Sequence, residues 1–312
     1  MRTFSDRLVD AIRSTGNPCV VGLDPRIDAM PAFITSGRAK ASRDTVRSVI
    51  RDFHELVLDT IADHAPAVKL QLAFFEQYGS AGIQAFEDTI QAAKQRGLLV
   101  IADAKRNDIA STAEAYAAAF LGETDIFGEQ QRIFDVDAMT VTPYLGRDSL
   151  VPYVEACEKY GKGLFVVLKS SNPGARDYQD QPLQATGRPL YENIAQTIRD
   201  LGAPMIGESS YSSVGAVIGA TFPEDAHRLR ALLPHAFFLV PGYGAQGASA
   251  RGAAACFNAD GLGAIVNSSR GITYCFGDEN VSKELFVKSV REKILRIKDD
   301  IEAACKALVP LE

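Results

Sequence analysis

Charged side chains gather in the segment IADAKRNDIAST, residues 101–112. Asp103 and Lys105 stand two residues apart, so on a strand their side chains point to the same side. Buried charges cost several kcal/mol unless they are neutralised, so the two form either a structural ion pair or part of a functional cluster. Asp108 is expected to begin the next helix, where it is either a helix cap or a further member of that cluster. Lys69, at the end of the preceding strand, favours the functional interpretation, because neighbouring strands would place it beside the same carboxylate.

A second group of candidate residues lies late in the chain, in PGYGAQG (241–247) and NSSRG (267–271). The three glycines of the first motif satisfy GxGxxG, the dinucleotide-binding fingerprint. That fingerprint should open the first βαβ unit and be followed by an acidic residue at the end of the next strand, and neither condition is met here. Glycines that let backbone N–H groups approach an anion, together with Arg270, instead predict a phosphate site.

Two shorter motifs also end predicted strands. Asp24 in GLDPR could accept hydrogen bonds from sugar hydroxyls, and Ser171 in SSNPG could contact an amide-like edge of a ligand. Both motifs are also good turn sequences, so the structural interpretation stands beside the functional one. The four histidines show no metal-ligand spacing, and no metal is required by the sequence.

The elements that must position these residues follow a repeated rhythm of strand and helix. Continuous apolar runs are typical of parallel strands covered on both faces. Helices are expected between the runs, over residues 44–63 and over residues 76–96, which end at Gly97 as a helix cap. Eight such units predict an α/β fold, a closed (β/α)8 TIM barrel formed as a single domain over residues 1–312. The eight predicted strands are 18–24, 66–72, 98–103, 137–141, 163–168, 214–219, 236–240 and 263–267.

Composition excludes several classes of function. The chain has 312 residues with 39 acidic and 33 basic side chains, a net charge of −6, so a nucleic-acid partner is not expected. No apolar run is long enough for a membrane span or a secretory signal. Five scattered cysteines indicate reduced thiols, and a cytoplasmic location is expected. Two long stretches after strand ends, 25–43 and 172–189, are candidate lids or walls of the site.

The motifs occur in one order along nearly the whole chain: GLDPR (22–26), VKLQ (68–71), DAKRNDIAST (103–112), SSNPG (170–174), PGYGAQG (241–247) and SSRG (268–271). In this order the sequence resembles the orotidine 5'-phosphate decarboxylase family, in its longer bacterial-type branch. The most specific signal is DxKxxDIxxT preceded by a lysine on the second strand. The resemblance implies decarboxylation of orotidine 5'-monophosphate to UMP and CO2, the last step of de novo pyrimidine nucleotide synthesis, without a cofactor.

The resemblance also implies roles for individual residues. Lys105 corresponds to the proton donor of a catalytic tetrad of alternating charges. Asp108 and Thr112 would enter the neighbouring subunit's site, which implies a homodimer with shared active sites. The stretches 120–135 and 172–189 look longer than in the compact branch of the family. The implied tetrad is Lys69, Asp103, Lys105 and Asp108, and the implied substrate contacts are Asp24 for ribose, Ser171 for the pyrimidine, and Gln246 and Arg270 for phosphate.

Three other functions remain open from the residues alone. A metal-dependent sugar-phosphate decarboxylase or aldolase on the same barrel would share DxKxxD, although Lys69 stands where an acidic metal ligand is expected and would repel Mg²⁺. A Schiff-base aldolase could use Lys69, Lys105 or Lys169. A phosphate-ligand sensor without catalytic activity would leave the charge tetrad unexplained.

Overall fold

Eight parallel strands close into a barrel in the order β1-β10-β9-β8-β7-β6-β3-β2. The computed structural model describes residues 2–38, 42–219, 223–243 and 249–308. The predicted (β/α)8 barrel is confirmed, and each of the eight predicted segments overlaps one strand. The barrel strands are β1 (Cys19–Gly22), β2 (Ala67–Gln71), β3 (Leu99–Arg106), β6 (Ala138–Val141), β7 (Gly163–Lys169), β8 (Ser212–Ile218), β9 (Ala236–Val240) and β10 (Ala264–Ser268).

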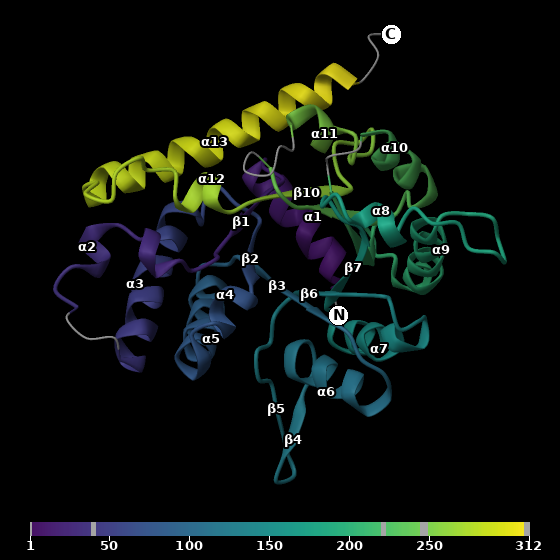
Figure 1. The fold of residues 1–312 in the computed structure, drawn as a ribbon, viewed down its shortest axis with the longest axis horizontal. Helices are drawn as coiled ribbons and strands as arrows, with labels where there is room; N and C mark the ends of the chain where they lie inside the picture. The colour runs from purple at the N-terminus through teal and green to yellow at the C-terminus, as the bar shows by residue number, and fades with distance from the viewer. Residues whose placement is uncertain (1, 39–41, 220–222, 244–248, 309–312) are drawn as a thin grey trace.

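Helices surround this barrel, and α13 is the longest of those described (Figure 1). The predicted helix 44–63 corresponds to α3, and the predicted helix 76–96 corresponds to α5 and to the last residue of α4. Gly97 follows α5 with φ of +75°, the left-handed conformation expected after a helix end. The α-helices are α1 (Phe4–Thr15), α2 (Ala32–Thr35), α3 (Arg43–Ile61), α4 (Ala73–Glu76), α5 (Gly79–Gln95), α6 (Ala110–Phe120), α7 (Val151–Tyr160), α8 (Ala175–Tyr178), α9 (Leu190–Gly202), α10 (Pro223–Leu232), α11 (Ala250–Ala254), α12 (Arg270–Thr273) and α13 (Lys283–Leu308), with short 3-10 turns at Ile27–Ala29, Asp148–Leu150 and Ala203–Met205.

The apolar core has two parts, one inside the barrel and one between the strands and the helices. Helix α1 joins the inner part, because Phe4 and Leu8 cluster with interior side chains such as Val20 and Ile265. Phe4 packs edge-on against Phe165 of β7, with ring centroids 5.9 Å apart. These contacts fill one end of the interior with apolar side chains and leave polar chemistry to the other end.

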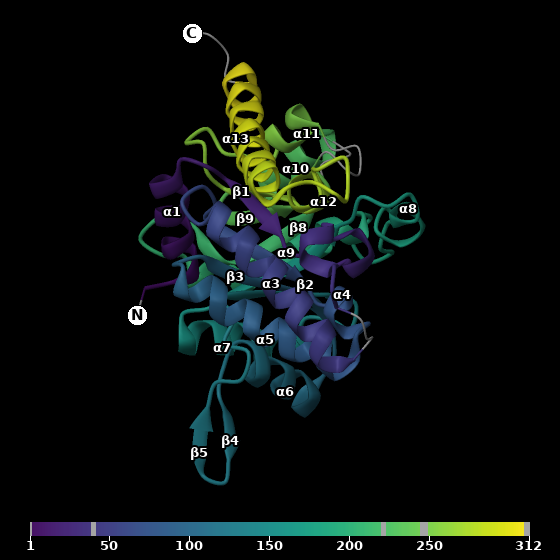
Figure 2. The same ribbon diagram turned by 90° about the vertical axis from the view of Figure 1, so that its left-hand side faces the viewer.

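A small hairpin of β4 (Thr124–Ile126) and β5 (Glu129–Gln131) projects from the barrel (Figure 2). It occupies the 120–135 stretch and has no counterpart among the predicted strands. Phe127 and Gly128 both have positive φ, which is the geometry of a type I' turn. The two strands are short and polar, so the sequence lacks the apolar run that predicts a strand. The turn has Phe-Gly in place of the usual Asn-Gly, so the sequence also lacks the usual hairpin signal.

Among the helices that the structure describes, none combines the length and apolar character needed to cross a bilayer.

Candidate active site

A cavity of about 320 Å³ opens where the carboxyl ends of the barrel strands meet. In barrels of this kind the loops that follow the strands form the site, because the strand ends converge there. Three strands supply the carboxylates and the lysines: β1 leads to Asp24, β2 carries Lys69, and β3 carries Asp103 and Lys105. Of the predicted site residues, the cavity is lined by Asp24, Lys69, Asp103, Lys105, Ser171 and Arg270.

Asp103 is the centre of the charged cluster. One carboxylate oxygen accepts hydrogen bonds from Lys69 Nζ at 2.7 Å and from Gln71 Nε2 at 2.9 Å. The other accepts from Lys105 Nζ at 2.5 Å and from Thr140 Oγ1 at 2.9 Å. Four donors on one buried carboxylate compensate for its loss of water and fix the positions of both lysines.

The two lysines differ in their access to the cavity. The side chain of Lys69 is 5% exposed, whereas that of Lys105 is 43% exposed. Burial lowers the pKa of Lys69, but the negative charges of Asp103 and Asp24 outweigh this effect and the pKa is raised. Burial would raise the pKa of Asp103, but the positive charges of Lys69 and Lys105 outweigh it and hold that pKa well below its usual range. Both shifts favour the charged forms, so Lys69 and Asp103 remain an ion pair at neutral pH.

The backbone at Lys105 departs from a regular strand. Its φ is +44°, which is costly for a residue with a side chain, and the pairing of β3 with β6 shifts register between Ala102 and Arg106. The N–H of Lys105 donates to Thr140 Oγ1 at 2.9 Å. Thr140 thus supports both the unusual backbone and the carboxylate of Asp103, so the bulge keeps Lys105 beside its counterion.

The backbone around Asp24 is held by the hydroxyl of Tyr274. The Tyr274 hydroxyl donates to the backbone carbonyl of Asp24 at 3.1 Å and accepts from the N–H of Arg26 at 2.9 Å. Asp24 Oδ1 is buried and has no hydrogen-bond partner among the described residues. A buried carboxylate oxygen without a donor is costly, so this atom is available for a donor on a ligand.

The loop after β7, which includes the predicted 172–189 stretch, is held at two points. Gln179 accepts from the N–H of Ser170 at 3.0 Å and donates to its hydroxyl at 2.8 Å. Asp180 forms an ion pair with buried Lys169. These contacts bring the loop back onto the strand end and place Ser171 at the cavity wall. They also engage Lys169 with carboxylates, which leaves it poorly placed as a free amine for Schiff-base chemistry.

The predicted phosphate side of the cavity is formed by residues after β9 and β10. Gly242 and Tyr243 follow β9 and Arg270 follows β10, and all three line the cavity. Arg270 has no ion-pair partner within the described ranges, so its charge is available for an anion. Gln246, the other predicted phosphate contact, lies outside the described residues.

Asp108 and Thr112 do not line the cavity of their own chain. The prediction that Asp108 begins a helix is wrong: α6 starts at Ala110, whose φ of +47° marks a bend in the chain. The carboxylate of Asp108 accepts a hydrogen bond from the N–H of Ile109 at 2.9 Å. It forms no ion pair with Lys69 or Lys105 in the described structure. Thr112 is exposed on α6. One chain therefore brings three of the four tetrad charges together.

Polar residues that line or support the site but were not among the candidates include Gln71, Thr140 and Asn267. Gln71 shares strand parity with Lys69, and that signal could have identified it. Thr140 carries no comparable signal, because its role depends on the shifted register of β3 and β6. Asn267 is buried, lines the cavity, and has an amide oxygen without a hydrogen-bond partner in the described structure. The sequence places Asn267 at the end of a predicted strand, but an amide side chain there does not indicate a particular ligand.

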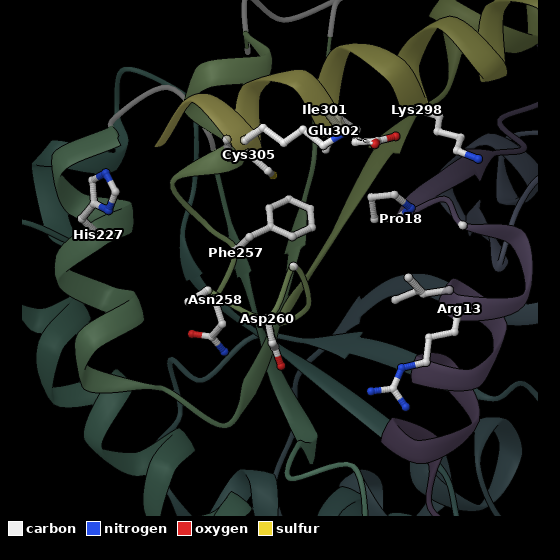
Figure 3. Close-up of a pocket in the computed structure, with 16 residues that line it drawn as sticks. Arg13, Pro18, His227, Phe257, Asn258, Asp260, Lys298, Ile301, Glu302 and Cys305 are labelled. Atoms are coloured by element: carbon white, nitrogen blue, oxygen red, sulfur yellow. Dashed lines mark hydrogen bonds and ion pairs between the residues drawn. The ribbon is translucent and has the colours of Figure 1, made fainter. Parts of the chain in front are cut away.

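A larger cavity of about 690 Å³ lies at the opposite end of the barrel (Figure 3). Its walls include Pro18, which precedes β1, Phe257, and Ile301 of α13. None of the predicted site residues lines it. Its carboxylates also have partners, since Asp260 accepts from Tyr211 at 2.9 Å and Glu302 pairs with Lys306 at 2.5 Å.

Within the described ranges, no three His, Cys, Asp or Glu side chains are arranged to hold a metal ion.

Comparison with known proteins gives a consistent result. The model of the orotidine 5'-phosphate decarboxylase / HUMPS family matches residues 20–284. Orotidine 5'-phosphate decarboxylase of Rhodopirellula baltica is 43% identical over 261 residues, which cover 84% of this chain and 85% of the relative. The enzyme of the same name from Caldicellulosiruptor bescii is 41% identical over 250 residues, covering 79% and 81%. The structure of Leishmania donovani OMP decarboxylase is similar with a TM-score of 0.69 and 32% identity, covering 95% of this chain and 99% of that chain.

Proposed function

The chain belongs to the orotidine 5'-phosphate decarboxylase family and converts orotidine 5'-monophosphate to UMP in pyrimidine nucleotide synthesis, and we propose that the cavity around Asp103 is its active site. The observation that carries this proposal is the arrangement of two lysines on one carboxylate. Lys69 is buried and fixed, whereas Lys105 is held by the same carboxylate but reaches into the cavity. The matches give no support to a metal-dependent decarboxylase or aldolase.

The reaction requires a stabilised carbanion. When the bond between C6 and the carboxylate breaks, CO2 leaves and the electron pair stays on C6, in the plane of the pyrimidine ring. The ring offers no conventional electron sink, so stabilisation must be electrostatic. The ammonium of Lys105 supplies the positive charge and then transfers a proton from Nζ to C6, after which water restores the proton to the amine.

Asp103 and Lys69 prepare Lys105 for this step. Asp103 fixes the Lys105 ammonium at 2.5 Å, and Lys69 neutralises the second oxygen of the carboxylate. We propose that Asp103 also faces the substrate carboxylate, so that their repulsion is relieved when CO2 leaves. This contribution is secondary to the stabilisation of the carbanion, because donors already occupy both oxygens of Asp103.

The remaining contacts orient the nucleotide. Asp24 Oδ1 accepts from a ribose hydroxyl, Ser171 contacts the pyrimidine, and Arg270 binds the phosphate together with Gln246. Asp24 has an unpaired oxygen and Arg270 an unpaired charge within the described ranges, which supports their assignments. Phosphate binding far from C6 contributes to catalysis when it drives closure of the loops over the ring.

We further propose a homodimer in which Asp108 and Thr112 complete the partner's site. Neither residue lines the cavity of its own chain, and the exposed apolar residues Ile109, Tyr144 and Leu145 lie on loops after the neighbouring strands β3 and β6. Exposed apolar side chains around a functional loop suit a subunit interface. We also propose that residues 1–312 form one domain and that the enzyme works in the cytoplasm, in keeping with its five free cysteines.

Replacing Arg270 with alanine tests the orientation of the nucleotide. The loss of a charge-assisted phosphate contact of about 1.5–3 kcal/mol should lower kcat/KM for orotidine 5'-monophosphate roughly 10- to 150-fold. Turnover of orotidine, which lacks the phosphate, is the matched control and should not change. Ultraviolet absorbance of the pyrimidine measures both rates. A fall of less than about threefold for the nucleotide would remove Arg270 from the phosphate site.

A further inference from the structure

A second cavity of about 810 Å³ adjoins the proposed phosphate site. Tyr243 and Arg270 line both cavities, so the two are neighbours at the position proposed for the 5'-phosphate. The outer wall of the second cavity is formed by α13. Ligand pockets of several hundred Å³ hold groups the size of a nucleotide or part of one.

The charges that line this second cavity are mainly positive and unneutralised. Arg270, Lys293 and Arg296 have no ion-pair partner among the residues that the structure describes. The acidic lining residue Glu292 already has a cation, Lys288, at 3.8 Å. Lys293 and Arg296 are three residues apart on α13, so they lie on one face of the helix. The cavity is therefore lined by three available cations, and one of them, Arg270, belongs to the proposed phosphate site.

A buried donor adds an independent observation. Ser268, at the end of β10, lines the second cavity and is 2% exposed. Its hydroxyl has no hydrogen-bond partner in the part of the chain that the structure describes. A buried hydroxyl without a partner is costly, and a phosphate oxygen in this cavity would satisfy it.

We propose that this cavity is a second anion subsite that binds the β- and γ-phosphates of a pyrimidine nucleoside 5'-triphosphate. This inference rests on the function proposed above. The pyrimidine, ribose and α-phosphate of such a nucleotide would occupy the active site, with the α-phosphate on Arg270. The two further phosphates would extend past Tyr243 to Lys293 and Arg296. Because the nucleoside occupies the active site, the triphosphate competes with orotidine 5'-monophosphate, and turnover falls as pyrimidine triphosphates accumulate.

Inhibition constants for UMP, UDP and UTP against orotidine 5'-monophosphate test this subsite. EDTA keeps the phosphates free of divalent cations. In the wild type, UTP should bind about tenfold more tightly than UMP, with UDP between them, since each added contact is partly exposed. In K293Q/R296Q the three constants should become equal within about twofold, while the constant for UMP and kcat/KM for the substrate stay unchanged.

The matched control is K283Q/R291Q, which removes two positive charges from the same helix outside the cavity and leaves the pair of Lys288 with Glu292 intact. It should retain the wild-type preference for UTP. Equal loss of that preference in both double variants would overturn the subsite, because it would show a general effect of charge. Equal constants for UMP and UTP in the wild type would overturn it as well. If the wild type fails to turn over the substrate, the proposed active site fails, and calorimetric titration with UMP and UTP still decides the subsite.

Discussion

Asp103→Ala is expected to destabilise the protein and abolish decarboxylation together. The substitution leaves Lys69 buried with its main counterion removed, and breaking a buried pair in this way costs about 3–5 kcal/mol of unfolding free energy. It also frees Lys105 from its position, so kcat should fall at least about 100-fold. Urea unfolding and pyrimidine absorbance measure the two effects.

A second variant at position 103 separates charge from packing, and a variant at position 59 is the control for stability. Asp103→Asn keeps the shape of the side chain but not its charge, so its activity should fall as in the alanine variant. Asp59→Ala removes an exposed carboxylate that pairs with Arg96 at 2.7 Å and should change stability by less than about 1 kcal/mol. If the Asp103→Ala variant kept near wild-type stability and activity, the charged cluster around Asp103 would not be the centre of the active site.

The stability difference between the wild type and Asp103→Asn should also depend on pH. The folded pKa of Asp103 is lowered, so its contribution is complete above the unfolded value of about 3.9 and is lost as the pH falls through the folded value. Urea unfolding at neutral pH and at about pH 3 should therefore give a smaller difference at the lower pH. A constant difference would show that the carboxylate is not ionically paired.

Mixing two inactive variants should restore activity if the active sites are shared. Lys105→Ala and Asp108→Ala each remove one group from every site of their own homodimer. A heterodimer of the two has one site with both defects and one intact site, so an equal mixture should recover about a quarter of the wild-type activity. The measurement is turnover after the subunits have exchanged.

The matched control mixes Lys105→Ala with Asp103→Asn. These two residues come from the same chain and touch each other at 2.5 Å, so no heterodimer contains an intact site. This mixture should stay inactive. Absence of recovery with Asp108→Ala, when exchange of subunits has been demonstrated, would refute the shared site and leave Asp108 without a catalytic role.

The fold was predictable because its signals are local. Each barrel strand carries a continuous apolar run, and the helices carry one apolar face, so the element types and their alternation follow from residue types alone. The β4–β5 hairpin was not predictable in the same way. Its strands have three residues each, and Phe127 stands at a turn position where asparagine is the usual signal.

The site was predictable where it depends on strand parity and not where it depends on backbone conformation. Asp103 and Lys105 were placed together by their spacing. Asp108 does not begin α6 because the helix starts after it, at a bend at Ala110, a residue whose type does not favour positive φ. The second cavity combines Arg270 with Lys293 and Arg296, and only tertiary packing of the last helix brings these residues to one place.

Turnover of orotidine 5'-monophosphate by the wild type and by Lys105→Ala, both in EDTA, tests the central claim most directly. The account predicts full wild-type activity without free divalent metal. It predicts a loss of at least about 10,000-fold in the variant, since both the proton donor and the charge that stabilises the carbanion are removed. Loss of wild-type activity in EDTA, or a variant that keeps more than about a tenth of the wild-type rate, would contradict it.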